Sequence, residues 1–373
     1  MTGAPVRQHV PFLDLAALHA ELRPELESAV LRVMRSGRVL LGPELQEFEE
    51  AWAAAVDARF AVGVGNGLDA LTLGLRALGV GPGDEVIVPS HTFIATWLAV
   101  VHVGAVPVPV DVRSANADWD AAALEAAVTA RTRAVLPVHL YGHPVDLAPV
   151  LDLARAHGLV VLDDAAQAHG ARLRGRPIGG LTSATAWSFY PGKNLGALGD
   201  GGAVTTSDPE VAARLRALRN YGSTVKYQHD QVGWNSRLDD LQAAVLSVKL
   251  HRLDEHNARR AAVADRYSAG LAGLGLTLPD VVDRATPAWH LYVVRTPHRD
   301  RLREHLTAAG VECGVHYPVP PHRQAAFSGS EAADRHLPVA DALAREVLSL
   351  PMGPMLTPDD QDRVIEALHS FRS

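Results

Sequence analysis

The sequence of 373 residues contains little cysteine and no excess of positive charge. Its one cysteine, Cys313, cannot form a disulfide within the chain, which fits a reducing compartment. Lysines and arginines number 35 against 42 aspartates and glutamates, and the net charge of −7 argues against a nucleic acid partner. The sequence also opens without a basic segment followed by an apolar one, so we expect no signal peptide and a cytoplasmic location.

Long apolar runs are almost absent. The uncharged run from Thr92 to Val110 approaches the length that a membrane span requires. Gly104, Pro107 and Pro109 interrupt this run, and His102 lies within it. We therefore expect a buried helix followed by a strand here, and no membrane partner.

The patterns that are present predict an α/β fold. Hydrophobic residues make up 47% of the chain, which is enough for a large core. The length favours two domains, and we place their boundary near Leu250, between residues 1–249 and a smaller C-terminal α/β domain of residues 250–373. Ser236 and Asp239 predict a capping box at the start of the helix that joins the two domains. Strand-like runs alternate with helical ones and predict a mainly parallel sheet, at Glu85–Val88, Val106–Val110, Ala134–Val138 and Leu159–Leu162.

A lysine lies between flexible turns in the segment Ser188–Asn194. An ordinary lysine has a pKa of about 10.4 and is a poor nucleophile at neutral pH. Pro191 and Gly192 favour a sharp turn that can direct Lys193 into a cavity. Taken alone, such a lysine is more typical of a solvated loop, whereas an imine-forming lysine requires a pocket that desolvates it. The choice between the two depends on other segments.

Two carboxylates follow the apolar run Leu159–Leu162. This pattern is typical of a buried parallel strand that ends at the edge where α/β sheets bind ligands. A carboxylate at that edge can hold the protonated ring nitrogen of a cofactor. The alternative is that one carboxylate caps the next turn. We expect Asp163 to cap the turn and Asp164 to point inward.

A glycine-containing turn between a strand and a helix occupies Phe60–Leu71. Backbone N–H groups at such a helix start bind anions, supported by the helix dipole. The glycines at 63, 65 and 67 do not match the dinucleotide fingerprint, because position 68 is leucine. The segment therefore favours a single phosphate over a dinucleotide.

Together these segments resemble the DegT/DnrJ/EryC1/StrS family of pyridoxal-phosphate sugar aminotransferases. The resemblance implies the fold of PLP-dependent aspartate aminotransferases (fold type I), with a mainly parallel mixed sheet in the large domain. Asp163, His91 and Trp187 are mild departures from the family pattern. The resemblance covers almost the whole chain and includes Val10–Leu15, Ser36–Glu44, Gly83–Thr96, Pro137–Gly142, Arg219–Ser223, Gly233–Asp239 and Gly314–Pro318.

The resemblance also implies roles for individual residues in binding pyridoxal 5'-phosphate, with no metal. Lys193 is similar to the Schiff-base lysine, Asp164 to the partner of the ring nitrogen, and Gln167 to the residue that binds the ring hydroxyl. Phe93 matches an aromatic residue that covers the cofactor face, although an aromatic at such a position is often plain core. The phosphate is expected at the backbone of Gly67 and Leu68 and the hydroxyl of Ser188, with Asn235 reaching the cofactor of a neighbouring subunit in a homodimer with shared active sites.

The implied reaction is a transamination in two halves. L-glutamate gives its amino group to the cofactor, and a nucleotide-linked keto sugar then receives it. Lys193 shuttles the protons. The residues expected to line the sugar-nucleotide site are Tyr190, Tyr221, Arg237, His316, Tyr317 and His322, although most of the 18 histidines in the chain must have no such role.

The segments Gly65–Leu71 and Ile94–Val100 are most similar to members that aminate carbon 3 of a dTDP-3-keto-6-deoxyhexose. The expected product is a dTDP-3-amino-3,6-dideoxyhexose for deoxyamino sugar biosynthesis in antibiotics. One alternative is a 4-aminotransferase that acts on a nucleotide-4-keto-6-deoxyhexose, as in perosamine formation. Another is a non-catalytic, cofactor-binding regulator, although no helix-turn-helix segment is evident. A related dehydratase branch has histidine where this chain has Lys193.

Overall fold

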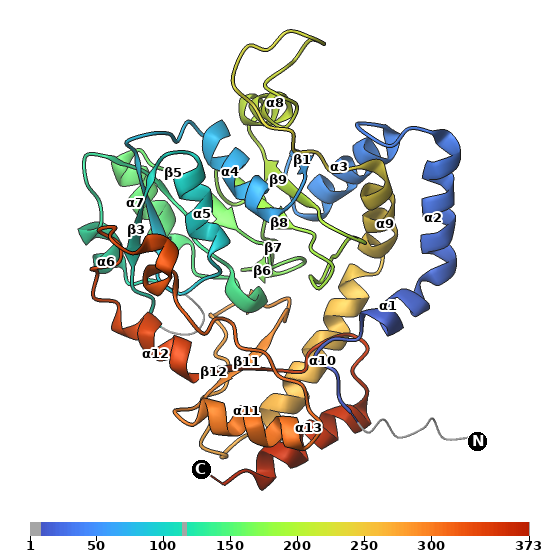
Figure 1. Cartoon of the computed structure of the whole chain (residues 1–373), viewed down its shortest axis with the longest axis vertical. Helices are drawn as coiled ribbons and strands as arrows, with labels where there is room; N and C mark the ends of the chain where they lie inside the picture. The colour runs from blue at the N-terminus through green and yellow to red at the C-terminus, as the bar shows by residue number, and fades with distance from the viewer. Residues whose placement is uncertain (1–8, 114–117, 373) are drawn as a thin grey trace.

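The computed structural model describes residues 9–113 and 118–372, and a seven-stranded sheet forms its centre (Figure 1). The strand order is β1-β9-β8-β5-β4-β2-β3, and only β9 runs antiparallel to its neighbours. The predicted mainly parallel mixed sheet is therefore confirmed. The strands are β1 (Phe60–Val64), β2 (Glu85–Pro89), β3 (Val106–Val110), β4 (Thr132–Val135), β5 (Val160–Asp164), β8 (Ala184–Ser188) and β9 (Gly202–Thr206).

Helices cover this sheet, and further helices, among them α10, α11 and α13, form a second layer at the bottom of the view (Figure 1). The α4–α5 pair packs together, and α2 and α3 both pack on α9. The helices are α1 (Leu15–Glu21), α2 (Arg23–Ser36), α3 (Pro43–Ala55), α4 (Gly67–Ala77), α5 (Ala95–His102), α6 (Ala121–Ala126), α7 (Ala148–His157), α8 (Pro209–Leu218), α9 (Asp240–Leu250), α10 (Leu253–Gly270), α11 (Arg299–Ala308), α12 (Pro338–Glu346) and α13 (Pro358–Ser370).

The uncharged run Thr92–Val110 folds as expected into a helix, α5, followed by the strand β3. Pro107 and Pro109 are tolerated in β3 because it lies at the end of the sheet, where one side of its backbone needs no ladder partner. Among the described residues, none of the helices combines the length and the apolar character needed to cross a membrane.

The C-terminal part of the chain builds a smaller layer. Its strands β11 (Tyr292–Arg295) and β12 (Val347–Leu350) pair antiparallel, and their core is shared with α10, α11 and α13. A further small sheet joins β10 (Ala285–Thr286), β6 (Arg172–Leu173) and β7 (Arg176–Pro177). Helix α9 ends at Leu250, and we propose the break before α10 as the boundary between the two domains.

The start of α9 differs from the prediction. Asp239 itself is the N-cap, and its carboxylate accepts the backbone N–H of Gln242 at 2.8 Å. The predicted capping box with Ser236 at the cap is therefore wrong. Ser236 instead fixes the glycine turn, because its hydroxyl accepts the N–H of Gly65 at 2.9 Å and donates to Asp69 at 2.5 Å.

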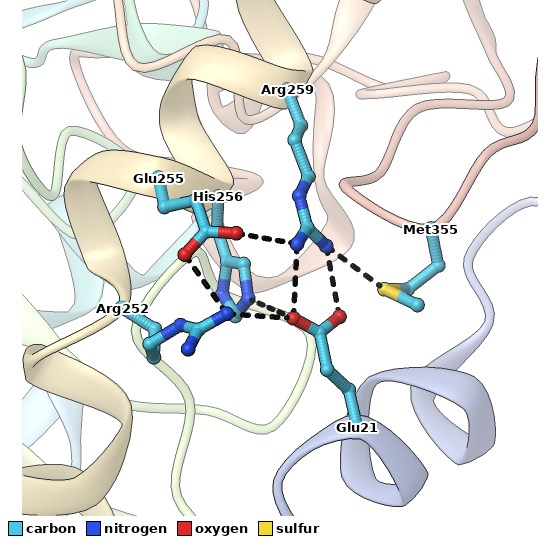
Figure 2. A network of polar contacts seen from close by, with 6 residues as sticks. All are labelled: Glu21, Arg252, Glu255, His256, Arg259 and Met355. Carbon is cyan, nitrogen blue, oxygen red and sulfur yellow. Dashed lines mark hydrogen bonds and ion pairs between the residues drawn. The ribbon is translucent and has the colours of Figure 1, made fainter.

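A network of charged residues joins α1 to α10 (Figure 2). Glu21, at the end of α1, accepts two hydrogen bonds from Arg259 at 2.8 and 3.0 Å and one from Arg252 at 3.2 Å. Glu255 pairs with both arginines, at 2.9 Å to Arg252 and 2.5 Å to Arg259. The hydrogen bonds from Arg259 lower the pKa of Glu21. We refer to these four residues as the Glu21 network; it holds α1, and the segment before it, against the smaller domain.

Candidate active site

A cavity of about 670 Å³ opens at the carboxyl edge of β5, where the sheet meets the smaller domain. Its walls come from segments far apart in the sequence, as expected for a site at the edge of an α/β sheet. The predicted site residues that line this cavity are Gly67, Leu68, Phe93, Asp164, Gln167, Ser188, Tyr190, Lys193, His316 and Tyr317.

Lys193 lies on a tight loop after β8. Its backbone N–H bonds to the carbonyl of Tyr190 at 2.9 Å, and the N–H of Ala197 bonds to the carbonyl of Phe189 at 2.8 Å. Burial lowers the pKa of the Lys193 ammonium to about 8, although nearby Asp164 favours the charged form. An amine with this pKa is about a tenth uncharged at pH 7, far more than an ordinary lysine. The amine is therefore desolvated, as an imine-forming lysine requires, and it is not a solvated loop residue.

The neighbour of Lys193 fixes this loop to the smaller domain. The amide of Asn194 donates to Asn257 at 2.8 Å and to the carbonyl of Ala288 at 2.7 Å. Its oxygen lies 3.1 Å from Nδ1 of His290, which lines the cavity. Burial, with the charge of Lys193 nearby, holds the pKa of His290 well below its usual value, so this histidine is neutral.

Asp164 ends β5 and faces the cavity. One carboxylate oxygen accepts the hydroxyl of Thr96 at 2.9 Å, and the other accepts the backbone N–H of Ala166 at 3.1 Å. Burial raises the pKa of Asp164, while these two hydrogen bonds and the charge of Lys193 act in the opposite direction. A buried carboxylate with donors of this kind is suited to hold a cation in the cavity.

Asp163 does not cap the turn, contrary to the prediction. Its side chain is fully buried, with Thr182 donating a hydrogen bond at 3.0 Å and Nε2 of His139 lying 3.7 Å away. Successive residues of a strand point to opposite faces, so Asp163 lies behind the sheet while Asp164 faces the cavity. The turn N–H is bonded by Asp164 instead.

The predicted anion site falls at the start of α4. Asn66 is the N-cap and accepts the N–H of Asp69 at 2.8 Å. The N–H groups of Gly67 and Leu68 belong to the first turn of the helix, which leaves its donors without helical partners. A side chain at Gly67 would approach Cβ of Ser188 to 2.6 Å, so glycine is required for this close packing. Together these groups form a cradle for a phosphate.

Aromatic and amide groups face each other across the cavity. Gln167 donates from Nε2 to the hydroxyl of Tyr317 at 3.2 Å, and the rings of Tyr317 and Phe93 are 5.2 Å apart. Phe93 is 50% exposed, so it is not a core residue. His316 bonds through Nδ1 to Ser349 at 2.8 Å, and burial lowers its pKa to about 4.

Four predicted residues lie outside this cavity in the described part of the chain. Asn235 is exposed and accepts a hydrogen bond from Arg237, which in turn lies over the ring of Tyr221 at 5.5 Å. His322 is 1% exposed, and its Nε2 lies 3.1 Å from Asp341. The structure thus gives the predicted sugar-binding role of His322 no support, because the imidazole is buried against a carboxylate.

Sequence reasoning missed several residues of the cavity wall. Phe12, Leu13 and Leu15 line it from the segment before α1, and Arg260 and His290 line it from the smaller domain. The segment Val10–Leu15 carried part of the family resemblance, which was a signal for the first three. Nothing in the local pattern around Arg260 or His290 distinguishes them from other helix and loop residues.

Trp187 and His91, which depart from the family pattern, do not face the cavity. Trp187 packs edge-on against Trp52 with ring centroids 4.9 Å apart, and its indole N–H donates to Thr205 at 2.9 Å. His91 is buried, with Nε2 2.8 Å from the hydroxyl of Tyr141. Both residues belong to the layers behind the cavity wall.

A desolvated lysine, a buried carboxylate and the N-terminus of a helix lie around one cavity at this edge of the sheet. The sequence profile of the DegT/DnrJ/EryC1/StrS aminotransferase family matches residues 20–369, and the chain belongs to this family. The predicted family, fold and enzyme class are therefore confirmed.

Individual relatives match over nearly the whole chain. A dTDP-3-amino-3,4,6-trideoxy-alpha-D-glucose transaminase of Streptomyces venezuelae is 56% identical, over 100% of this chain and 98% of its own. The crystal structure of S. venezuelae DesV in complex with a ketimine intermediate is also 56% identical, covers 96% of this chain and 97% of its own, and has a TM-score of 0.94. NtdA from Bacillus subtilis, with bound cofactor PMP, is 32% identical over 98% of this chain and 85% of its own, with a TM-score of 0.91.

Proposed function

We propose that this protein transfers an amino group from L-glutamate to carbon 3 of a dTDP-linked 3-keto-6-deoxyhexose, with pyridoxal 5'-phosphate as cofactor. The observation that carries the reaction type is the placement of Lys193 and Asp164 on one cavity. Amination at carbon 3 of a dTDP-linked sugar is supported by the 56% identical dTDP-3-amino-3,4,6-trideoxy-alpha-D-glucose transaminase from S. venezuelae. The product belongs to deoxyamino sugar biosynthesis.

The described residues fit pyridoxal phosphate. The Lys193 amine is desolvated and can form the covalent bond to the aldehyde, and Asp164 can hold the proton on the ring nitrogen. Gly67, Leu68 and Ser188 lie together at the start of α4, where backbone N–H groups and a hydroxyl can bind a phosphate. When bound, the cofactor supplies an electron-withdrawing ring that stabilises negative charge on the carbon that carries the amino group.

Lys193, Asp164 and two neutral histidines have different roles in the proposed reaction. Lys193, with its amine free and uncharged, would be the base that takes the proton from the donor's α-carbon. Asp164 keeps the ring nitrogen protonated because its carboxylate is fixed by Thr96 and Ala166. His290 and His316 stay neutral because burial lowers the pKa of each, so neither competes with Lys193 as a proton donor at neutral pH.

The choice between carbon 3 and carbon 4 is testable with purified substrates. The protein would be incubated with L-glutamate and either a 3-keto or a 4-keto dTDP-6-deoxyhexose, and the amino sugar identified by mass and NMR. We expect turnover of the 3-keto sugar, its loss in Lys193→Ala, and its retention in Arg345→Ala, which changes an exposed basic residue of α12 outside the cavity. Turnover of the 4-keto sugar alone would reject the assignment in favour of the perosamine-type alternative.

The regulatory alternative predicts a different result. A cofactor-binding sensor would bind the nucleotide sugar and never release an aminated product. We disfavour it because the nucleophile, its carboxylate partner and the phosphate cradle all face one cavity. Multiple turnovers per protein chain in the assay above would exclude it, and a single turnover without release would favour it.

The working unit in this proposal is a homodimer in which Asn235 reaches the partner's cofactor phosphate. Asn235 lies outside the cavity of its own chain and is exposed. The loop between α8 and α9 that precedes it projects from the large domain (Figure 1), and Tyr227 and Val232 in this loop are each 84% exposed. Apolar side chains are costly to leave in water, so a second copy of the chain is the expected cover for this loop.

A further inference from the structure

Tyr141 lies behind the wall of the active-site cavity and contacts two residues that line it, Gln167 and His316. It belongs to the family-like segment Pro137–Gly142, to which the proposed function assigns no role. The side chain is 2% exposed, and its φ of 60° is a conformation that residues other than glycine rarely adopt. Neighbouring contacts must therefore hold it in place.

The backbone of Tyr141 orients Gln167. The Tyr141 N–H donates to Oε1 of Gln167 at 2.6 Å. Because the amide oxygen is engaged there, the amide nitrogen is turned toward the cavity, where it donates to Tyr317. Gln167 can therefore present a donor, and not an acceptor, to a ring hydroxyl in the cavity.

The hydroxyl of Tyr141 bonds to His316, which lines another part of the cavity wall. It donates to the carbonyl of His316 at 2.5 Å, because a carbonyl oxygen can only accept. The same hydroxyl lies 2.8 Å from Nε2 of His91, which must then be the donor. Burial lowers the pKa of His91 to about 4, so His91 is neutral at pH 7 with its proton on Nε2, and its Nδ1 has no partner among the described residues.

A third connection comes from the main chain. The carbonyl of Tyr141 accepts the N–H of Leu291 at 3.1 Å, and the carbonyl of Gly142 accepts that of Ala288 at 2.8 Å. Gly142 has no room for a side chain, since an added Cβ would lie 2.8 Å from the backbone nitrogen of His290. The segment therefore sits directly against the loop that carries His290.

We propose that Tyr141 is a positioning residue for the transamination. Its backbone amide sets the orientation of Gln167 toward the cofactor, and its hydroxyl, oriented by His91, sets the position of the His316–Tyr317 segment toward the sugar. Tyr141 itself does not line the cavity. This inference rests on the proposed function, because it assigns the two walls to cofactor and sugar.

Tyr141→Phe separates the two effects, because it removes the hydroxyl and keeps the backbone N–H. We expect the KM for the keto sugar to rise about fivefold, the effect of one net hydrogen bond, with kcat and the KM for L-glutamate changed less than about twofold. The absorbance spectrum of the bound cofactor should stay as in the wild type. The matched control is Tyr292→Phe, another buried tyrosine, whose hydroxyl meets Ser268 at 3.0 Å outside the cavity wall.

A variant of His91 tests the same hydroxyl through its other partner. His91→Leu should raise the same KM, and adding it to Tyr141→Phe should raise the KM no further, because both changes act through one hydroxyl. If the wild type is active and the KM for the keto sugar is equal in Tyr141→Phe and Tyr292→Phe, the positioning role of Tyr141 is wrong and the proposed function still stands. A wild type that aminates no keto sugar would instead reject the proposed function, and the inference with it.

Discussion

Thr96 donates a hydrogen bond of 2.9 Å to Asp164, across 68 residues of sequence. Thr92 lies 2.9 Å from the same Thr96 hydroxyl, so the two threonines form a chain that ends on the carboxylate. Since burial raises the pKa of Asp164, each donor that bonds it helps to keep it ionised. The anion that the mechanism requires therefore depends on α5 as well as on β5.

Removing this donor tests the role of Asp164. In Thr96→Val we expect kcat to fall about tenfold, because a hydrogen bond to a charged group contributes about 1.5–3 kcal/mol. Asp164→Asn should keep the fold and lose most activity. Thr205→Val, on the opposite face of the sheet, is the control and should lower the melting temperature with little effect on kcat. Near-normal turnover in Asp164→Asn would remove this residue from the mechanism.

The lowered pKa of Lys193 predicts a pH dependence. Only the uncharged amine attacks an aldehyde, and the pKa of Lys193 is lowered to about 8. The rate at which the cofactor-free protein binds pyridoxal phosphate covalently should therefore rise with pH and reach half its maximum near pH 8. Stopped-flow absorbance would measure it. A midpoint near pH 10 would mean that the amine is solvated like an ordinary lysine.

The Glu21 network predicts a coupling between stability and the cavity. Glu21→Gln should lower the free energy of unfolding by about 1–3 kcal/mol at pH 7, because it removes one of the two carboxylates that pair with Arg259. The folded-state pKa of Glu21 is lowered, so its contribution is present above a pH of about 4.5 and is lost as pH falls through the folded pKa. The difference between variant and wild type should shrink accordingly in urea titrations at acidic pH.

A control separates this network from ordinary surface pairs. Asp152→Asn breaks the exposed contact to Arg155 at 2.9 Å and should cost less than about 1 kcal/mol. Because Phe12 and Leu13 line the cavity before α1, Glu21→Gln should also raise the KM for the sugar. Equal stabilities of the two variants would show that the network is no stronger than a surface pair.

Shared active sites predict complementation between inactive chains. A dimer of one Lys193→Ala chain and one Asn235→Ala chain would contain one site with both native residues, if Asn235 acts on the partner's cofactor. Refolding a mixture of the two should therefore restore about a quarter of wild-type activity, since about half of the dimers are mixed and half of their sites are native. Recovery absent from a mixture shown to contain mixed dimers would place Asn235 in its own chain's chemistry.

The fold and much of the site could be predicted because local patterns specify them. Apolar runs that end in carboxylates or glycines mark strand ends, and these ends meet at one edge of the sheet. The contacts of Asp163 and Ser236 could not be predicted, because the choice between capping and burial depends on neighbours distant in sequence, Thr182 for one and Asp69 for the other. His290 was missed for the same reason, since its cavity position follows from Asn194, 96 residues away.

In the proposed mechanism one lysine, Lys193, forms the covalent bond to the cofactor. The chain contains three lysines, Lys193, Lys226 and Lys249. Lys249 is a stringent comparison, because burial lowers its pKa to about 8 as well, yet its Nζ bonds to the carbonyl of Gly196 at 2.6 Å and does not line the cavity. If the lowered pKa alone determined reactivity, the cofactor would form a covalent bond with both Lys193 and Lys249.

Reduction of the cofactor-loaded protein with borohydride, followed by peptide mass spectrometry, identifies the lysine that carries the cofactor. We expect a single pyridoxyl adduct on the peptide that contains Lys193, and none on Lys249 or Lys226. An adduct on Lys249 or Lys226, with Lys193 unmodified, would contradict the proposed mechanism.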